Sequence, residues 1–147
     1  MFKPKNFEIY ELVPDYIYKQ YQFKSYLLWN AFDDRMLYTL DRLRKRYGKM
    51  IMNDWYWRKK DPLANRYRGW RDPKCEIGAI ISQHKFWRAG DPVPMEVTAE
   101  EIRQDVLYSP FHEDFKYITC IEANVGWFHF DVRSREKEKD GILIIKP

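Results

Sequence analysis

The 147-residue chain lacks several features that define large classes of proteins. It has two cysteines, Cys75 and Cys120, which are too few for a disulfide framework. No apolar run approaches the length needed to span a bilayer, and residues 1–5 are not followed by the apolar stretch of a secretory signal. These absences predict a protein that is synthesised in the cytoplasm without a signal peptide and is not inserted into a membrane.

The chain also has little excess of charge of one sign, because 26 basic residues are nearly balanced by 22 acidic residues and the net charge is +4. The excess is scattered along the chain and no nucleic-acid-binding motif accompanies it, so we expect no nucleic-acid partner. The excess would favour approach to an anionic surface such as a bacterial wall. An ordinary solvated surface explains it at least as well.

Hydrophobic residues, in contrast, are plentiful. They make up 45% of the chain, and aromatic residues make up 18%, which excludes a disordered chain. A chain of this length forms one domain of ordinary size with a real core. We expect a single monomeric domain over residues 1–147, with a helical lead-in over residues 1–32 and a C-terminal turn and strand over residues 134–147.

Local signals predict three helices. Pro14 is suited to the first turn of one helix. Asp33 or Asp34 can cap a second helix, which Gly48 ends. A capping box that begins at Thr98 opens a third. The predicted helical ranges are 15–21, 34 to about 47, and 99 to about 108.

The order is helices first and then strands with one inserted helix, which predicts an α+β fold. Residues 58–76 are basic and irregular and predict a long functional loop. Residues 123–126 separate two alternating runs and predict a hairpin turn. Pro92 and Pro94 cannot donate to a strand ladder, so the extended segment around Asp91 is expected at a sheet edge. The predicted strand ranges are 50–57, 117–122, 127–133 and 141–145.

The chain has only three histidines, and two of them lie in ordered, motif-like contexts. His84 precedes Asp91 by a short segment, and His129 lies on the second strand of the predicted hairpin. Two imidazoles and a carboxylate suit Zn²⁺ and leave a fourth tetrahedral position for water, as in a catalytic zinc site. Either histidine alone would be read as an ordinary core residue. Together with Asp91, they predict a zinc site.

These residues carry a resemblance to a known family. Ser82, His84, Ala89 and Asp91 match the pattern Ser-x-His-x-x-Gly-x-Ala-x-Asp, and Gly69-Trp70-Arg71 matches the Gly-aromatic-Arg that precedes it. The chain therefore resembles the zinc D-Ala-D-Ala carboxypeptidase family, whose fold is shared with the Hedgehog signalling domain. The resemblance covers roughly residues 35 to 133. The sequence departs from the pattern at two positions, where Trp87 replaces the usual glycine and Pro92 follows Asp91.

The resemblance implies a fold, a reaction and a substrate class. The implied fold is a small antiparallel sheet with helices packed on it. The implied reaction is zinc-dependent hydrolysis of peptidoglycan stem peptides, by a D-Ala-D-Ala carboxypeptidase or an endolysin-type endopeptidase. Small members without a signal suggest a bacteriophage or prophage origin and release to the cell wall on lysis. The alternative is a peptidase-fold protein that has lost catalysis and acts as a binding or structural module.

Two carboxylates compete for the role of general base. If the hairpin loop is residues 123–126, Glu122 lies opposite Trp127 and diagonal to His129, within reach of a metal-bound water. We therefore favour Glu122. Asp131 remains open as the alternative, because it shares the His129 face of the strand.

Each remaining candidate residue has a functional and a purely structural interpretation. Arg71 could bind a peptide carboxylate or polarise the scissile carbonyl, or it could be an ordinary surface arginine. Cys120 could in principle ligate, although a buried strand thiol is the commoner outcome. Ser82 is better read as a turn residue or as support for the ligands than as a nucleophile. The three tryptophans that could wall a substrate cleft or belong to the core are Trp55, Trp87 and Trp127.

Overall fold

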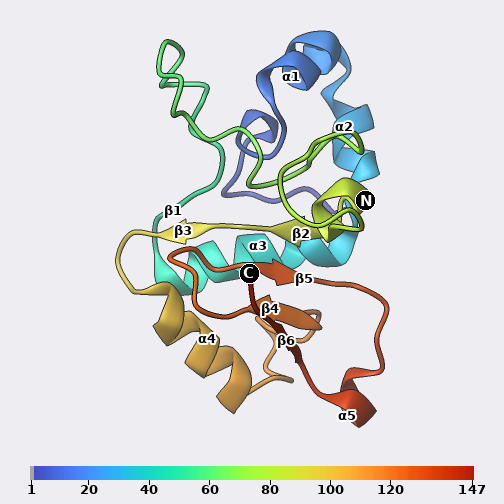
Figure 1. The fold of residues 1–147 in the computed structure, drawn as a ribbon, viewed down its shortest axis with the longest axis vertical. Helices are drawn as coiled ribbons and strands as arrows, with labels where there is room; N and C mark the ends of the chain where they lie inside the picture. The colour runs from blue at the N-terminus through green and yellow to red at the C-terminus, as the bar shows by residue number, and fades with distance from the viewer. Residues whose placement is uncertain (1) are drawn as a thin grey trace.

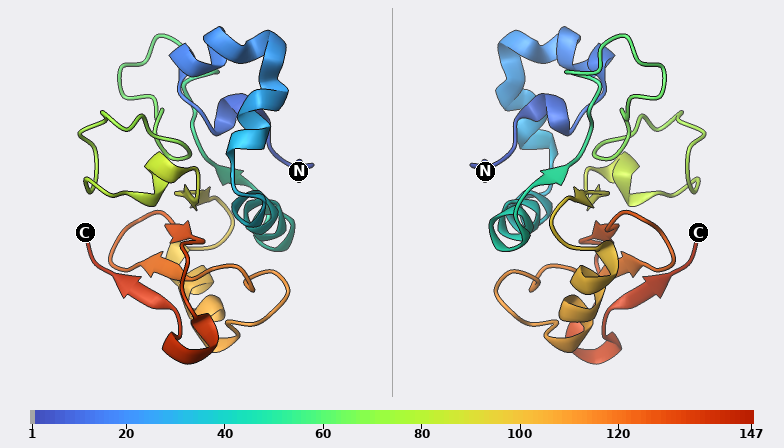
Figure 2. Two further views of the ribbon diagram at one scale, coloured as in Figure 1. Left: turned by 90° about the vertical axis from the view of Figure 1, so that its right-hand side faces the viewer. Right: turned by 90° about the vertical axis from the view of Figure 1, so that its left-hand side faces the viewer.

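The structure, a computed structural model, describes residues 2–147 and is a mixed α/β protein with small sheets and several helices. This architecture agrees with the predicted α+β class. Figures 1 and 2 show the N-terminal helices at one end, the sheets in the middle and α4 and α5 at the other end. The helical elements are η1 (Ile9–Glu11), α1 (Asp15–Tyr21), η2 (Gln22–Lys24), α2 (Ser25–Ala31), α3 (Asp34–Tyr47), η3 (Gln83–Phe86), α4 (Ala99–Tyr108) and α5 (Lys137–Asp140). The strands are β1 (Met50–Ile51), β2 (Ala89–Gly90), β3 (Val93–Pro94), β4 (Cys120–Glu122), β5 (Phe130–Asp131) and β6 (Leu143–Ile145).

The two longest helices begin and end where their sequence signals predict. The Asp33 carboxylate caps α3 by accepting a hydrogen bond from the Arg35 backbone N–H, and Gly48 follows the last residue of the helix. Thr98 and Glu101 form the reciprocal capping box that opens α4. Capping satisfies backbone N–H groups that have no partner inside the helix, which is why these signals can be read locally.

The core lies between α3, α4 and the larger sheet. Apolar side chains of α3 have no exposed surface, and they meet aromatic and aliphatic side chains from the C-terminal half. Helix α3 also contacts β2, where the methyl group of Met36 lies against Gly90. The fully buried members of this core include Met36, Leu37, Leu40, Leu43, Ile102, Phe115, Ile118, Phe128 and Phe130.

The larger sheet has the strand order β2-β5-β4-β6, and β1 and β3 form a separate antiparallel pair. β5 pairs antiparallel with both β2 and β4, but β6 pairs parallel with β4. The predicted purely antiparallel sheet is therefore wrong at its last strand. The single turn of α5 carries the chain back, so that β6 runs in the same direction as β4 (Figure 1).

The predicted hairpin register is wrong by two residues. Cys120 pairs with Asp131, and the Glu122 backbone N–H donates to the His129 carbonyl at 3.4 Å. Glu122 therefore lies opposite His129, not opposite Trp127. The cause is buried Arg103 on α4, whose guanidinium donates to the carbonyls of Glu122, Val125 and Trp127 and holds open a wider loop than the predicted four-residue turn.

The strand predicted over residues 50–57 is short, because only Met50 and Ile51 pair with a neighbour. Beyond them the chain turns, and the backbone N–H groups of Asp54 and Trp55 donate to the Asn65 carbonyl. Residues 58–76 contain no helix or strand, in agreement with the predicted loop.

Candidate metal centre

Three segments that are distant in sequence meet at His84, Asp91 and His129. His84 lies on η3, Asp91 directly follows β2, and His129 directly precedes β5. β2 and β5 are paired, which brings Asp91 and His129 together. η3 is followed by the turn at Trp87 and then by β2, and η3 contacts β2. His84 on η3 therefore lies beside Asp91 and His129.

Trp87, at which the chain departs from the pattern that it resembles, makes the turn after His84. Its φ of 62° lies in the left-handed region, which suits the glycine that the pattern usually has there. Its indole stacks on Trp70 with ring centroids 4.7 Å apart and meets Phe32 edge-on at 4.8 Å. Aromatic packing therefore holds a backbone conformation that costs a non-glycine residue free energy.

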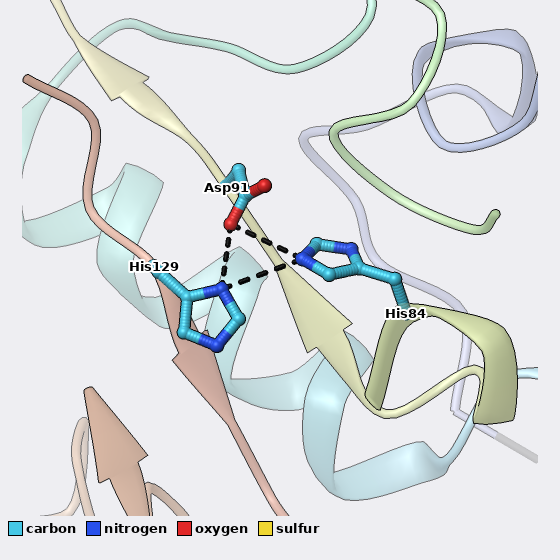
Figure 3. Close-up of side chains that lie close together, drawn as sticks. All are labelled: His84, Asp91 and His129. Atoms are coloured by element: carbon cyan, nitrogen blue, oxygen red, sulfur yellow. Dashed lines mark hydrogen bonds and ion pairs between the residues drawn. The ribbon is translucent and has the colours of Figure 1, made fainter. Parts of the chain in front are cut away.

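The three candidate ligands form a small buried triangle. The His129 Nδ1 atom lies 2.7 Å from Asp91 Oδ1, His84 Nε2 lies 3.2 Å from the same oxygen, and the two ring nitrogens are 3.4 Å apart. Figure 3 shows both imidazoles directed at one carboxylate oxygen. All three side chains are less than one tenth exposed. Within residues 2–147, this is the group of histidine, cysteine or acidic side chains that could hold a metal ion.

This geometry fits a tetrahedral metal. Donor atoms that bind a central ion at ~2.1 Å with tetrahedral angles lie ~3.4 Å from one another, close to the observed separations. The donor set of two imidazoles and one carboxylate also suits zinc. Cys120 is not part of the group, whose ligand atoms all lie within 4.8 Å of one another. Burial and the neighbouring Asp131 raise the pKa of its thiol to about 12.

Each imidazole has its second nitrogen held by an acceptor. The His84 Nδ1 atom lies 2.6 Å from the Gly69 carbonyl oxygen, and His129 Nε2 lies 3.4 Å from Asp131 Oδ2. If these nitrogens carry the protons, the remaining lone pairs point to the shared Asp91 oxygen. Metal-binding histidines in proteins are usually held in this way.

Asp131 is in turn fixed by Arg133. Its carboxylate has no exposed surface and accepts two hydrogen bonds from the guanidinium, at 2.8 and 2.5 Å. Burial alone would raise the pKa of Asp131, but the bonds from Arg133 and His129 outweigh it and lower that pKa. Asp131 is thus a permanently charged partner of His129. We predicted its place on the His129 face but assigned it only as a possible base.

Two residues of the Gly-aromatic-Arg match contact the candidate ligands, and the third supports the turn that follows His84. Gly69 supplies the carbonyl for His84, and its position admits only glycine, because a Cβ atom would lie 2.2 Å from the Leu12 carbonyl oxygen. Trp70 packs on Trp87. Arg71 donates through Nη2 to Asp91 Oδ2 at 2.7 Å and through Nε to the Tyr67 carbonyl. The Arg71 guanidinium is therefore already paired with a candidate metal ligand.

Electrostatic attraction between the imidazoles and the carboxylates shifts the pKa values of Asp91 and His129. Burial by itself would raise the pKa of Asp91, but the charge and hydrogen bonds of His84 and His129 hold that pKa well below its usual range. Burial lowers the pKa of His129, whereas Asp131 and Asp91 together raise it to about 9. In the absence of a metal, His129 is protonated at neutral pH and the centre is held together by ion pairs.

A cavity of about 420 Å³ opens beside Asp91. Its walls include Ile77 and Trp127 together with three arginines, Arg66, Arg68 and Arg71. Asp91 is the only acidic residue in this lining. Burial lowers the pKa of Arg68, whose guanidinium lies 5.6 Å from the centroid of the Trp127 ring. No pattern in the sequence distinguishes Arg68 from the basic residues that surround it.

The remaining residues considered from the sequence lie outside the ligand triangle. Glu122 is half-buried and lies across the strand pair from His129, so its role as base stays a prediction. Trp55 is in the core, where its indole N–H donates to the Val13 carbonyl, so only Trp127 of the three tryptophans lines the cavity. Ser82 precedes η3 as a turn residue. His112, the third histidine, accepts a hydrogen bond from the Asp114 backbone N–H and lies outside the centre.

Comparison of the chain with known protein families, with curated proteins and with solved structures gave no match. No helix within residues 2–147 has both the length and the apolar character that crossing a membrane requires. The fold and the site therefore define an α/β protein with a candidate three-residue metal centre.

Proposed function

We propose that this protein is a zinc-dependent peptidase of the Hedgehog/D,D-peptidase fold type that hydrolyses peptidoglycan stem peptides. The observation that carries the proposal is the buried triangle of His84, Asp91 and His129, with donor separations suited to one tetrahedral ion. The contacts from Gly69 and Arg71 to this triangle support the resemblance on which the substrate class depends. Trp70 supports it through Trp87, on which it stacks. In this proposal the protein is a monomer without a nucleic-acid partner and reaches the wall on lysis.

In the proposed site, His84, Asp91 and His129 would hold the zinc ion. Zinc in such a site activates water and polarises a carbonyl group. Hydrolysis breaks the amide C–N bond and forms a C–O bond from water, and one proton of the water passes to the departing amine. Glu122, directly across the strand pair from His129, is the proposed carrier of that proton. Asp131 and Arg133 would fix the orientation of His129.

A second candidate is a metal-binding module without catalysis. The observation in its favour is the pairing of Arg71 with Asp91, which occupies the group predicted to bind or polarise substrate. Both candidates bind zinc, and only the peptidase cleaves a peptide. Metal content and hydrolysis must therefore be measured separately.

Elemental analysis of the purified protein tests the metal site. We expect one zinc per chain in the wild type and a large loss in His84→Ala and His129→Ala. His112→Ala provides the matched control, because it removes the one histidine outside the triangle and should keep the zinc. Full zinc occupancy in both ligand variants would show that the ligand set is wrong.

Digestion of purified peptidoglycan tests the reaction. Mass spectrometry should detect released D-alanine or split stem peptides, and a chelator should suppress both. A folded, zinc-loaded protein that releases nothing from any peptidoglycan chemotype would refute the peptidase and favour the binding module.

A further inference from the structure

The three arginines that line the cavity differ in how their charges are compensated. Arg71 forms an ion pair with Asp91 at 2.7 Å. Arg66 donates to the Ala64 carbonyl at 2.8 Å and lies 3.9 Å from an Asp15 oxygen. Within residues 2–147, Arg68 has no carboxylate oxygen within 4.0 Å of its guanidinium. Arg68 is thus the arginine of this cavity that contacts no carboxylate directly, and Asp91 and Asp54 act on its charge only from a longer distance.

Arg68 is nevertheless held in place. Its backbone N–H donates to the Asn53 side-chain oxygen at 2.9 Å, and its Nη1 donates to the Asp91 backbone carbonyl at 3.2 Å. Its Nε is buried without a hydrogen-bond partner, and the guanidinium packs over the Trp127 ring. A carbonyl oxygen compensates a full positive charge poorly, so a fixed guanidinium faces the cavity with unused capacity for an anion.

We propose that Arg68 binds the terminal carboxylate of the substrate, so that the protein cleaves the last peptide bond and acts as a carboxypeptidase. This inference rests on the proposed function and specifies its substrate. A guanidinium and a carboxylate pair through two parallel hydrogen bonds, a geometry that an amide terminus cannot reproduce.

The position of Arg68 supports cleavage at the last bond. Its guanidinium is hydrogen-bonded to the main chain of Asp91, whose side chain belongs to the candidate metal site. One extended residue spans only ~3.3–3.6 Å, so a carboxylate anchored at Arg68 would leave the adjacent peptide bond close to the metal ligands. Ile77 and Trp127 provide apolar walls beside it, which suit a small apolar side chain such as that of alanine.

The test compares two forms of one peptide, diacetyl-L-Lys-D-Ala-D-Ala as the free acid and as the C-terminal amide. Dissociation constants are measured by calorimetry on zinc-loaded protein that carries Glu122→Gln to slow turnover. We expect the acid to bind about tenfold more tightly or better, the usual advantage of a charge-assisted hydrogen bond. Arg68→Gln should abolish this preference, and Arg68→Lys should keep part of it.

Arg66→Gln is the matched control, since it removes a guanidinium from the same cavity and should leave the preference unchanged. Zinc content and circular dichroism of each variant establish that the fold and the metal site are intact. Equal binding of acid and amide, no binding of either, or a preference that depends on Arg66 and not on Arg68 would overturn the inference. If the acid binds more tightly through Arg68 but the otherwise wild-type protein hydrolyses no peptide, Arg68 is confirmed as the carboxylate-binding residue. The proposed peptidase activity is then refuted.

Discussion

At the scale of single residues, the two carboxylates near His129 have different surroundings. Asp131 is fully buried, bonded to Arg133 and directed at the His129 ring. Its lowered pKa makes it a poor proton acceptor, and no exposed surface is left for substrate. Glu122 is half-buried and is not tied into this pair. These surroundings favour Glu122 as the base and Asp131 as the residue that orients a ligand.

We predict that Asp131→Asn lowers the zinc affinity roughly 10–100-fold, the usual effect of removing a partner that holds a metal-binding histidine. The amide keeps the shape of the side chain but removes the charge that holds His129 and Arg133. Competition with a chelating dye measures the affinity, and saturating zinc should restore occupancy.

Glu122→Gln provides the contrast. It should keep the zinc affinity while turnover falls by roughly 10²–10⁴-fold, the usual contribution of general-base catalysis. A fully active Glu122→Gln protein together with an inactive, zinc-saturated Asp131→Asn protein would require the two roles to be exchanged.

Proton competition should make zinc binding depend on pH. Because Asp131 and Asp91, acting against burial, raise the pKa of His129 to about 9, zinc must displace a proton from this ring at pH 7. We expect release of about one proton per zinc bound at pH 7, and about half a proton at pH 9, where the ring is half protonated. Calorimetry in buffers of different ionisation enthalpy counts the protons.

The stability of the metal-free protein should follow the opposite trend with pH. A pKa that folding raises, as for His129, stabilises the fold fully below the unfolded value of 6.5, and this contribution is lost as the pH rises to about 9. The lowered pKa of Asp91 stabilises the fold above 3.8, and its contribution is lost as the pH falls. Urea denaturation between pH 6 and 9 should show falling stability for the metal-free protein, and a flat profile would contradict this assignment.

At the scale of elements, the irregular segment before η3 lies against the Arg71 guanidinium at Gly78. Its φ is +81°, and a Cβ atom there would lie 2.7 Å from Nη1 of Arg71. We predict that Gly78→Ala lowers the free energy of unfolding by roughly 1–2 kcal/mol through the left-handed backbone. It should also reduce turnover by displacing the guanidinium that contacts Asp91.

Gly126→Ala is the control for this substitution. Gly126 lies in the loop before His129, its φ is not positive, and a Cβ atom there would meet nothing within 4 Å. We expect its stability to change by less than ~0.5 kcal/mol. Equal effects of the two substitutions in urea denaturation would contradict the role given to Gly78.

The elements that were predicted correctly are those whose signals are local. The caps of α3 and α4 lie within a few residues of the helix ends, so the sequence could place both helices. The hairpin register could not be read locally, because it depends on a guanidinium from α4 that binds three carbonyls of the loop. The parallel direction of β6 was missed because α5 is a single turn in a charged segment.

The same distinction applies to the site. His84, Asp91 and His129 could be proposed together because their residue types and spacing suit one metal. The pairing of Arg71 with Asp91 depends on how the loop folds over β2, which no short pattern encodes. The unpaired charge of Arg68 likewise becomes visible only when the carboxylates around it can be located.

At the scale of the whole molecule, the centre joins segments from η3, the end of β2 and the start of β5. An ion bound by all three stabilises the folded state in proportion to RT ln(1 + [zinc]/Kd). We predict that zinc at 100 times its dissociation constant raises the free energy of unfolding by about 2.7 kcal/mol, and that a chelator reverses the gain. Thermal denaturation with and without chelator measures the effect.

His129→Ala is the control for this measurement, since its melting temperature should not respond to chelator. A chelator-sensitive melting temperature in this variant, or an insensitive one in the wild type, would show that zinc does not bind across the three segments.

The order of the larger sheet has a consequence for self-association. Its two outer strands are β2 and β6. At the end of β2 the outward direction is closed, because the Asp91 backbone N–H donates to the Arg68 carbonyl. Within residues 2–147, no backbone hydrogen bond from outside the sheet covers the outer edge of β6, and Ile144 on it is half exposed. A second chain that extended the sheet would therefore add at β6, three strands away from β2, and would leave the cavity beside Asp91 open to substrate.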